Sequence, residues 1–245
     1  MMNIANSKSI KRKSIIVAAV LIVLGIAMAV AAGVIFKNRQ DSNHDKQMWD
    51  QHAKEAQLNT ADVTPEMRDK YQTAPNKPRY INIPKIKLDK VRVIEVGLTN
   101  PNRNGEQQID APKGIHDAGW FNCKINDRQN SCDKTTYPGE NDTNNAVLID
   151  GHSCSGRGCV FDHIDQLKPG DKIDLVLGDN KTISYKVVTT ERVKLQNLDI
   201  DKLLRPVTAG KAGMNLITCA GTWSMKDTRG VRSMDQRVIV YTEKL

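Results

Sequence analysis

The sequence has few aromatic residues and no basic stripe. Its 245 residues include three Phe, three Trp and five Tyr, and no Lys/Arg run is interleaved with aromatic side chains. Residues 1–78 carry 11 Lys/Arg and 7 Asp/Glu, and residues 79–245 carry 25 and 21, so each part has a net charge of +4. Because nucleic-acid-binding surfaces cluster cations and stacking aromatics, this composition argues against a nucleic-acid partner.

The sequence after Arg79 also lacks any run of 12 or more residues with helical periodicity. Short β-branched runs alternate there with turn residues such as Gly170-Asp171. The expected strands are 80–83, 91–94, 146–149, 173–177, 183–188, 214–218 and 237–241. Many short strands without crossover helices predict an all-β domain, either an antiparallel barrel or a sandwich. Short helices are expected near 160–167 and 199–204.

One stretch, Ile15 to Phe36, is 22 residues long and has no charge. About 20 apolar residues suffice to cross a bilayer as a helix. Four cations precede the stretch, which predicts a cytoplasmic tail at 1–14, a transmembrane anchor at 15–36 and the remaining chain outside the cell. The alternative is a cleaved signal peptide with Ala29-Val30-Ala31 as its cleavage site, but the apolar run is long for that purpose.

A polar stretch follows the apolar run. Residues 37–78 are rich in Asn, Gln, Asp and Lys, include a helical pattern over 45–58, and contain prolines at 65, 75 and 78. Such a composition cannot form a core of its own. We therefore expect 37–78 to be a stalk and 79–245 to be the folded domain.

The five cysteines are uneven in their spacing. Cys123 and Cys132 bracket eight residues, and Cys154 and Cys159 bracket four. Outside the cell thiols tend to pair, so two local disulfides are the simplest arrangement, although four cysteines allow three connectivities. Cys219 is then the odd cysteine, which indicates either intermolecular pairing or a reactive centre.

Three residue types associated with thiol chemistry stand at strand ends. His152 follows the strand that ends in L-I-D, Cys219 ends the strand N-L-I-T, and Arg237 opens the final strand. A thiolate can attack a carbonyl while an imidazole moves protons, and a cation can stabilise the resulting oxyanion. Taken alone, each residue more often has a structural role: a small buried hydrophobe, a hydrogen-bonding histidine or a solvated charge.

The motifs around these residues resemble the sortase family of Gram-positive cysteine transpeptidases. Residues 215–219, N-L-I-T-C, match the family's T-L-x-T-C signature except at Asn215, where Thr is usual. Gly151-His152 resembles the family's G-H segment, and residues 237–240, R-V-I-V, resemble its final strand. Further similar segments, in the family's order, are I-N-I-P-K-I at 81–86, A-G-W-F at 118–121, P-G at 138–139 and L-K-P-G-D-K-I at 167–173.

The resemblance implies a fold and a set of roles. The expected fold is a closed eight-stranded β-barrel over residues 79–245, with no cofactor. Cys219 would be the nucleophile, His152 the general acid/base, and Arg237 the group that holds substrate and stabilises the oxyanion. Arg232 is the second candidate for that last role, and Thr218 is expected to line the substrate groove.

The resemblance also implies partners and a location. The donor would be a surface protein with a C-terminal LPxTG-like signal, and the acceptor an amine of a cell-wall precursor or of another protein, such as a pilin lysine. The catalytic domain would face outward from the cell membrane. The sequence leaves open the donor motif, the acceptor, and whether the enzyme anchors surface proteins or polymerises pili. Residues 195–213 are the expected selectivity region.

Three alternatives use the same residues differently. His152, Cys154, Cys159 and His163 have the composition of a zinc site, although C-x-x-C spacing is lacking and a disulfide explains the cysteines. The segment 155–159, S-G-R-G-C, loosely resembles the nucleophile motif of L,D-transpeptidases. The third alternative is a non-catalytic, disulfide-bonded surface binding module. Cys154, close to His152 in sequence, could also pair with Cys219 in an oxidised state.

Overall fold

The computed structural model describes residues 4–102, 104–127, 132–154, 156–226 and 230–245, with side chains for all of these except 4–25, 224 and 225. Spatial proximity divides the chain into two compact units, Met1–Met48 and Trp49–Leu245. Residues 49–78, which the sequence assigns to the stalk, therefore belong to the same compact unit as the strands.

Two helices precede the strands. Helix α1 spans Ile4–Glu55 and includes most of the helix expected at 45–58. Helix α2 spans Pro65–Lys70, and the Thr64 hydroxyl caps it by accepting the Met67 N–H at 3.2 Å. Proline suits the first position of α2 because its φ is already helical and it has no N–H to leave unpaired.

The apolar run at 15–36 falls within α1. Its residues 15–25 lie outside the described side chains. Within the described part of the chain, no helix is both long and apolar enough to cross a membrane.

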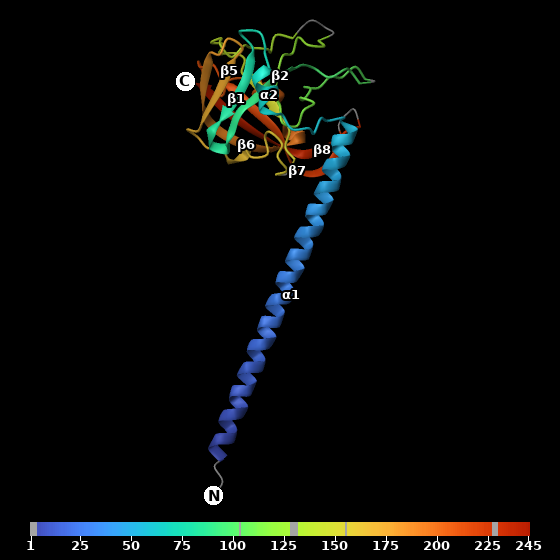
Figure 1. Ribbon diagram of the computed structural model, residues 1–245, viewed down its shortest axis with the longest axis vertical. Helices are drawn as coiled ribbons and strands as arrows, with labels where there is room; N and C mark the ends of the chain where they lie inside the picture. The colour runs from blue at the N-terminus through green and yellow to red at the C-terminus, as the bar shows by residue number, and fades with distance from the viewer. Residues whose placement is uncertain (1–3, 103, 128–131, 155, 227–229) are drawn as a thin grey trace. The chain divides into compact units, whose positions relative to one another are not determined.

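Eight strands form a closed barrel, which confirms the barrel that the resemblance implied (Figure 1). Their order around the barrel is β1-β2-β3-β4-β7-β8-β6-β5, and β5 pairs with β1 to close it. The strands are β1 (Pro78–Ile83), β2 (Leu88–Val96), β3 (Ala118–Phe121), β4 (Val147–Gly151), β5 (Lys172–Leu177), β6 (Thr182–Lys194), β7 (Met214–Lys226) and β8 (Arg232–Lys244).

The expectation of a purely antiparallel sheet is wrong. Strand β2 pairs with β3 in parallel, and β4 pairs with β7 in parallel. Parallel neighbours need a long connection between them. Residues 97–117 provide it for the first pair, and the segment containing β5 and β6 provides it for the second. Among the described residues of both connections there is no long helix, the element that usually indicates a parallel crossover in a sequence.

Strand β3 was not among the expected strands. All four residues of its A-G-W-F sequence are buried, so it shows no polar–apolar alternation. The short helices occur where they were expected, η2 at Ile164–Gln166 and α3 at Ile200–Leu203, and two further 3-10 turns, η1 (Pro84–Ile86) and η3 (Leu195–Asn197), flank β1 and β6.

The core lies inside the barrel, with a second cluster outside it. Fully buried interior residues include Ile81, Trp120, Ile149, Leu175 and Leu216. A second cluster joins the end of α3 to β4 and β8, and it contains Leu148, Leu203, Leu204, Ile239 and Tyr241. These clusters fix β4, β7 and β8 as rigid neighbours, and the candidate site lies at the ends of these three strands.

Candidate active site

Three adjacent strands bring the sequence-predicted residues to one end of the barrel. Cys219 on β7 stands directly opposite Arg237 on the antiparallel β8. On the other side of β7, the parallel β4 pairs Asp150 with Ile217. His152 and Cys219 each lie two residues beyond that pair, so both follow the same end of a parallel ladder. The structure therefore gathers Cys219, His152 and Arg237 at one level of three neighbouring strands.

The strand ends are joined next to the cysteine. The Thr218 hydroxyl is buried and donates to the Gly151 carbonyl oxygen at 2.7 Å. Gly151 must be glycine, because a Cβ there would lie 2.6 Å from the Phe161 ring. Cys219 itself is a half-buried free thiol. The G-H and T-C motifs thus lie side by side, and the Thr218 hydroxyl bonds to β4.

The Arg237 guanidinium is held close to its own strand. One terminal nitrogen, Nη1, donates to the carbonyl oxygens of Met234 at 2.9 Å and Gln236 at 2.8 Å. The other, Nη2, donates to the Ser233 hydroxyl at 3.0 Å. These contacts fix a half-buried cation across from Cys219.

Arg232, the second arginine candidate, lies elsewhere on the same hairpin. It pairs with Lys226 near the far end of β7. Its backbone N–H donates to Glu55 at 3.1 Å, and its side-chain Nε lies 3.5 Å from the same carboxylate. In register, Arg237 is the arginine opposite Cys219, whereas Arg232 is bound to the end of α1.

The His152 imidazole is buried on one side by a loop. Its Nε2 lies 2.7 Å from the Pro112 carbonyl oxygen, which can only accept, so Nε2 carries a proton and Nδ1 is the other titrating nitrogen. Burial lowers the pKa of His152, the nearby His52 and Lys113 lower it further, and the Pro112 carbonyl and Asp110 oppose the shift.

The loop after His152 is closed by the disulfide between Cys154 and Cys159. The Asp162 carboxylate also organises this loop. It accepts the backbone N–H groups of Cys154, Gly158 and Cys159 and the hydroxyl of Ser153. A carboxylate that accepts several donors fixes a short loop that has no regular secondary structure. The segment beside the imidazole is therefore stiff.

The Cys154–Cys159 disulfide argues against the alternative uses of these cysteines, as zinc ligands, as an L,D-transpeptidase nucleophile or as a partner of Cys219. It removes two of the four ligands that a zinc site built from His152, Cys154, Cys159 and His163 would need. It also leaves Cys159 without the free thiol that an L,D-transpeptidase nucleophile requires. Cys154 is paired with Cys159 and not with Cys219, which is free.

The second disulfide joins Cys123 and Cys132, the other short pairing that the spacing favoured. Cys123 is fully buried in the outer cluster, and its backbone N–H donates to the Thr135 hydroxyl at 2.7 Å. The Cys132 N–H donates to the Asp127 carboxylate at 2.8 Å. This bridge stiffens the connection between β3 and β4.

Sequence reasoning missed several residues near the site. Asp150 lies two residues before His152, and burial together with the Asp110 charge raises its pKa. Its Oδ1 is buried without a hydrogen-bond partner in the described part of the chain and contacts the place where a Cβ on Gly119 would stand. The signal in the sequence was the carboxylate of Asp150 at the end of the otherwise apolar run V-L-I-D. Nothing in the sequence pointed to Pro112.

Asn215, the one departure from the T-L-x-T-C signature, has a structural explanation. It is fully buried, and its amide donates to the carbonyl oxygens of Leu203 at 2.7 Å and Arg205 at 3.0 Å. These bonds attach the segment 195–213 to β7. The substitution thus acts at the buried end of the strand, four residues from Cys219.

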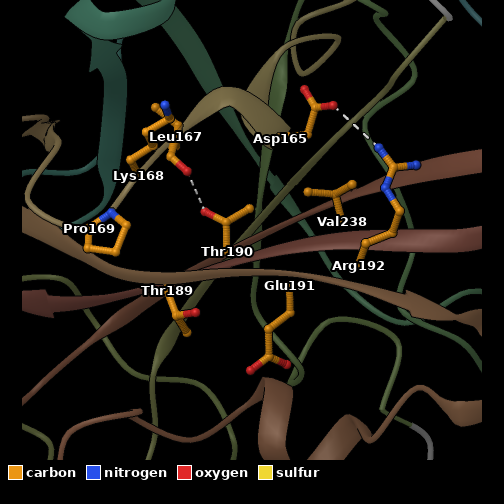
Figure 2. Close-up of a pocket in the computed structure, with 9 residues that line it drawn as sticks. All are labelled: Asp165, Leu167, Lys168, Pro169, Thr189, Thr190, Glu191, Arg192 and Val238. Atoms are coloured by element: carbon orange, nitrogen blue, oxygen red, sulfur yellow. Dashed lines mark hydrogen bonds and ion pairs between the residues drawn. The ribbon is translucent and has the colours of Figure 1, made fainter.

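A cavity of about 380 Å³ lies beside β6, and Cys219, His152 and Arg237 are not among the residues that line it. Figure 2 shows Arg192 facing Asp165, and Thr190 facing the Leu167 carbonyl oxygen. The first pair is an ion pair of 3.3 Å, and in the second the Thr190 hydroxyl donates to the carbonyl oxygen. Val238, the neighbour of Arg237, also lines it. The cavity lining contains neither Cys219 nor His152.

Comparisons with known proteins identify the family of the chain. Residues 81–245 match the family model described as a sortase domain. The fold is similar to sortase C from Clostridium perfringens SM101 (17% identity, 84% of this chain, 90% of that chain, TM-score 0.42) and to sortase C-1 from Actinomyces oris (21%, 77%, 83%, 0.46). It is also similar to sortase A from Corynebacterium diphtheriae (18%, 80%, 84%, 0.45). A search of curated proteins gave no match. The domain match covers most of the chain, and the chain belongs to the sortase family of cysteine transpeptidases.

Proposed function

We propose that this sortase cleaves an LPxTG-like sorting signal and transfers the new acyl end to an amine. The observation that carries this proposal is the placement of Cys219, His152 and Arg237 at one level of β4, β7 and β8. A free thiol, an imidazole and a fixed guanidinium are the groups that acyl transfer requires.

In the first half-reaction, the Cys219 thiolate attacks the carbonyl carbon of the threonine in the signal. A C–S bond forms, and the carbonyl oxygen becomes an oxyanion that the Arg237 guanidinium stabilises. Collapse of this intermediate breaks the peptide bond. The departing amine takes a proton from the His152 imidazolium, which leaves a thioester on Cys219 and a neutral imidazole.

In the second half-reaction, an acceptor amine attacks the thioester. Neutral His152 removes a proton from that amine, and the Cys219 thiolate leaves as the new amide bond forms. No water is consumed and no redox change occurs. Both the thiolate and the imidazolium are restored for the next turnover.

We infer from the sequence that the enzyme acts at the outer face of the cell membrane. The uncharged run at 15–36 would anchor it, with residues 1–14 in the cytoplasm. Its donors would be surface proteins with LPxTG-like signals, and its acceptor a cell-wall precursor or a protein amine such as a pilin lysine. Protease added to intact protoplasts should degrade the catalytic domain; a protected domain would contradict this orientation.

The test of the reaction is an assay with pooled peptides. The full-length chain in detergent is incubated with LPxTG-like peptides and an amine, and the products are identified by mass. We expect cleavage after threonine and an amide between threonine and the amine. A chain that binds peptides without cleaving them would support the surface-binding alternative. Cleavage by the Cys219→Ala variant would show that the nucleophile is misassigned.

A further inference from the structure

The end of helix α1 folds onto the loops that surround His152. Trp49 and Leu58 pack against Ile115 and against the Cys154–Cys159 disulfide. The backbone N–H of Asn59 donates to the Lys113 carbonyl at 2.7 Å, and the Asn59 carbonyl accepts the Ile115 N–H at 3.0 Å. The Lys113 ammonium also donates to the Ala56 carbonyl at 3.3 Å. Residues 49–59 are thus bound to both loops that flank the imidazole.

Within this segment, His52 lies close to the His152 ring. Its ring centroid lies 5.0 Å from that of Trp223 and 6.5 Å from that of His152, and the two imidazoles meet edge to face. Its Nδ1 lies 2.7 Å from the Arg232 carbonyl oxygen. Because a carbonyl only accepts, Nδ1 carries the proton and the His52 ring has a fixed orientation.

Glu55, almost one turn further along α1, strengthens this attachment. Its carboxylate accepts the Arg232 backbone N–H at 3.1 Å and lies 3.5 Å from the Arg232 side chain. His52 and Glu55 therefore hold one residue of β8 from the same helical face. The His52 ring is therefore hydrogen-bonded to the first residue of β8 and also lies edge to face against the His152 ring.

We propose that His52 is a positioning residue for His152, and that residues 49–59 belong to the active centre instead of the stalk. The Pro112 carbonyl restrains one nitrogen of the His152 ring, and the His52 ring restrains its edge. This proposal rests on the proposed acyl transfer, in which one imidazole must give a proton in the first half-reaction and take one in the second. An imidazole that rotates away from the reacting groups would perform neither proton transfer.

The electrostatic surroundings agree with this geometry. The charged or titratable groups that face His152 are His52, Lys113 and Asp110. The His52 ring in turn lies against the His152 ring and the Arg232 backbone carbonyl, and the Glu55 carboxylate and the Arg232 guanidinium pair with each other beside that carbonyl. Removal of the His52 ring would expose His152 and remove the electrostatic effect of His52 that lowers the pKa of His152. Both changes raise the pKa of His152 toward its ordinary value.

The test uses three variants of the full-length chain: His52→Ala, His52→Phe and, as a control, His44→Ala. His44 lies on the same helix, two turns earlier, and is exposed. Two properties are measured: the pH profile of kcat/KM on a cleaved peptide, and the NMR titration of His152, which needs no substrate. Melting temperatures confirm that each variant is folded.

We expect His52→Ala to lower kcat/KM by about 10- to 100-fold, the range expected when a catalytic group is misplaced. The acid limb of the profile and the His152 titration should both move to higher pH. His52→Phe keeps a ring against His152 and should recover most of the lost rate. His44→Ala should match the wild type in both measurements.

Two outcomes would overturn the proposal. A His52→Ala enzyme with wild-type kcat/KM and an unmoved His152 titration would show that the contact is only structural. A faster His52→Ala enzyme would show that the segment covers the site and hinders substrate. If the wild type cleaves no peptide, the proposed reaction fails, and the His152 titration alone then decides whether His52 restrains it.

Discussion

The two ends of the β7–β8 ladder differ although they belong to the same two strands. At one end Leu216 pairs with Val240, both fully buried in a regular register. At the other end Cys219 pairs with half-buried Arg237, and beyond Ala220 the register becomes irregular as far as Trp223 and Met225. The buried end supplies rigidity, and the irregular end supplies reactive groups.

This difference shows how a barrel can hold reactive side chains in place. Polar groups at the open end are positioned by backbone carbonyls and short loops, not by burial of their own apolar surface. Substitutions at the buried end should therefore change stability and spare the chemistry of the folded enzyme. Substitutions at the open end should lower the reaction rate and leave the stability of the fold nearly unchanged.

The largest expected effect is that of His152→Ala at the open end. The proposed mechanism uses the His152 imidazole to give a proton in one half-reaction and to take one in the other, so we expect kcat/KM to fall by up to about 10⁴-fold. The melting temperature should change little. Substantial turnover in a folded variant would remove His152 from the mechanism.

Arg237→Lys should have the next largest effect. Lysine keeps the charge but loses the planar fork that grips several acceptors. Loss of one oxyanion donor typically lowers the rate by about 100- to 1000-fold, and Arg237→Ala should be worse. Arg232→Ala is the matched variant on the same strand. If Arg232→Ala loses most of its kcat/KM and Arg237→Lys keeps a kcat/KM near that of the wild type, then Arg232 holds the catalytic position.

Leu216→Ala should act on stability alone. Deleting a fully buried leucine side chain costs about 2–5 kcal/mol of unfolding free energy, since a cavity is left behind. Denaturant unfolding measures this loss, while kcat per folded molecule should stay near wild type. Ile200→Ala, at a position on α3 that is 44% exposed, is the control and should change stability by less than about 0.5 kcal/mol. A Leu216→Ala protein that is stable but inactive would contradict the division between the two ends.

The smallest expected effect is a dependence of stability on pH. Since the pKa of His152 is lowered in the folded state, the unfolded chain binds a proton at a higher pH than the folded one. Stability should therefore fall as pH decreases from about 6.5, the ordinary value, to the folded pKa. Urea unfolding of His152→Gln should lack this decrease. The acid limb of kcat/KM should likewise lie below about 6.5, and a limb above that value would contradict the assignment.

Much of the fold could be predicted because its strands carry local signals. The alternating runs of β5 and β6 and their Gly-Asp turns are strong local patterns, and the structure has strands at these places. Strand β3 could not be recognised, since burial on both faces removes the alternation. The parallel pairs could not be found, because only contacts between distant segments determine them.

The site could be predicted only where chemistry leaves a motif. Cys219, His152 and Arg237 stand in recognisable sequence contexts, and the structure places them together. Their supporting groups have no such context: Pro112 acts through a backbone carbonyl, and Asp162 acts by accepting loop N–H groups. His52 had a weak signal, since Trp49, His52 and Ala53 share one face of a helix. The polar composition of residues 37–78 favoured the interpretation as a stalk, so this helical face was not recognised as one that packs against the domain.

The central claim, acyl transfer through Cys219 at the open end of the barrel, is tested most directly by trapping the acyl-enzyme. The full-length chain is mixed with an LPxTG-like peptide without an amine, quenched in acid, digested and mapped by mass. The account predicts the peptide's acyl fragment on Cys219, its release by added amine, and no adduct in Cys219→Ala. An adduct on another residue, or cleavage by Cys219→Ala, would contradict the account.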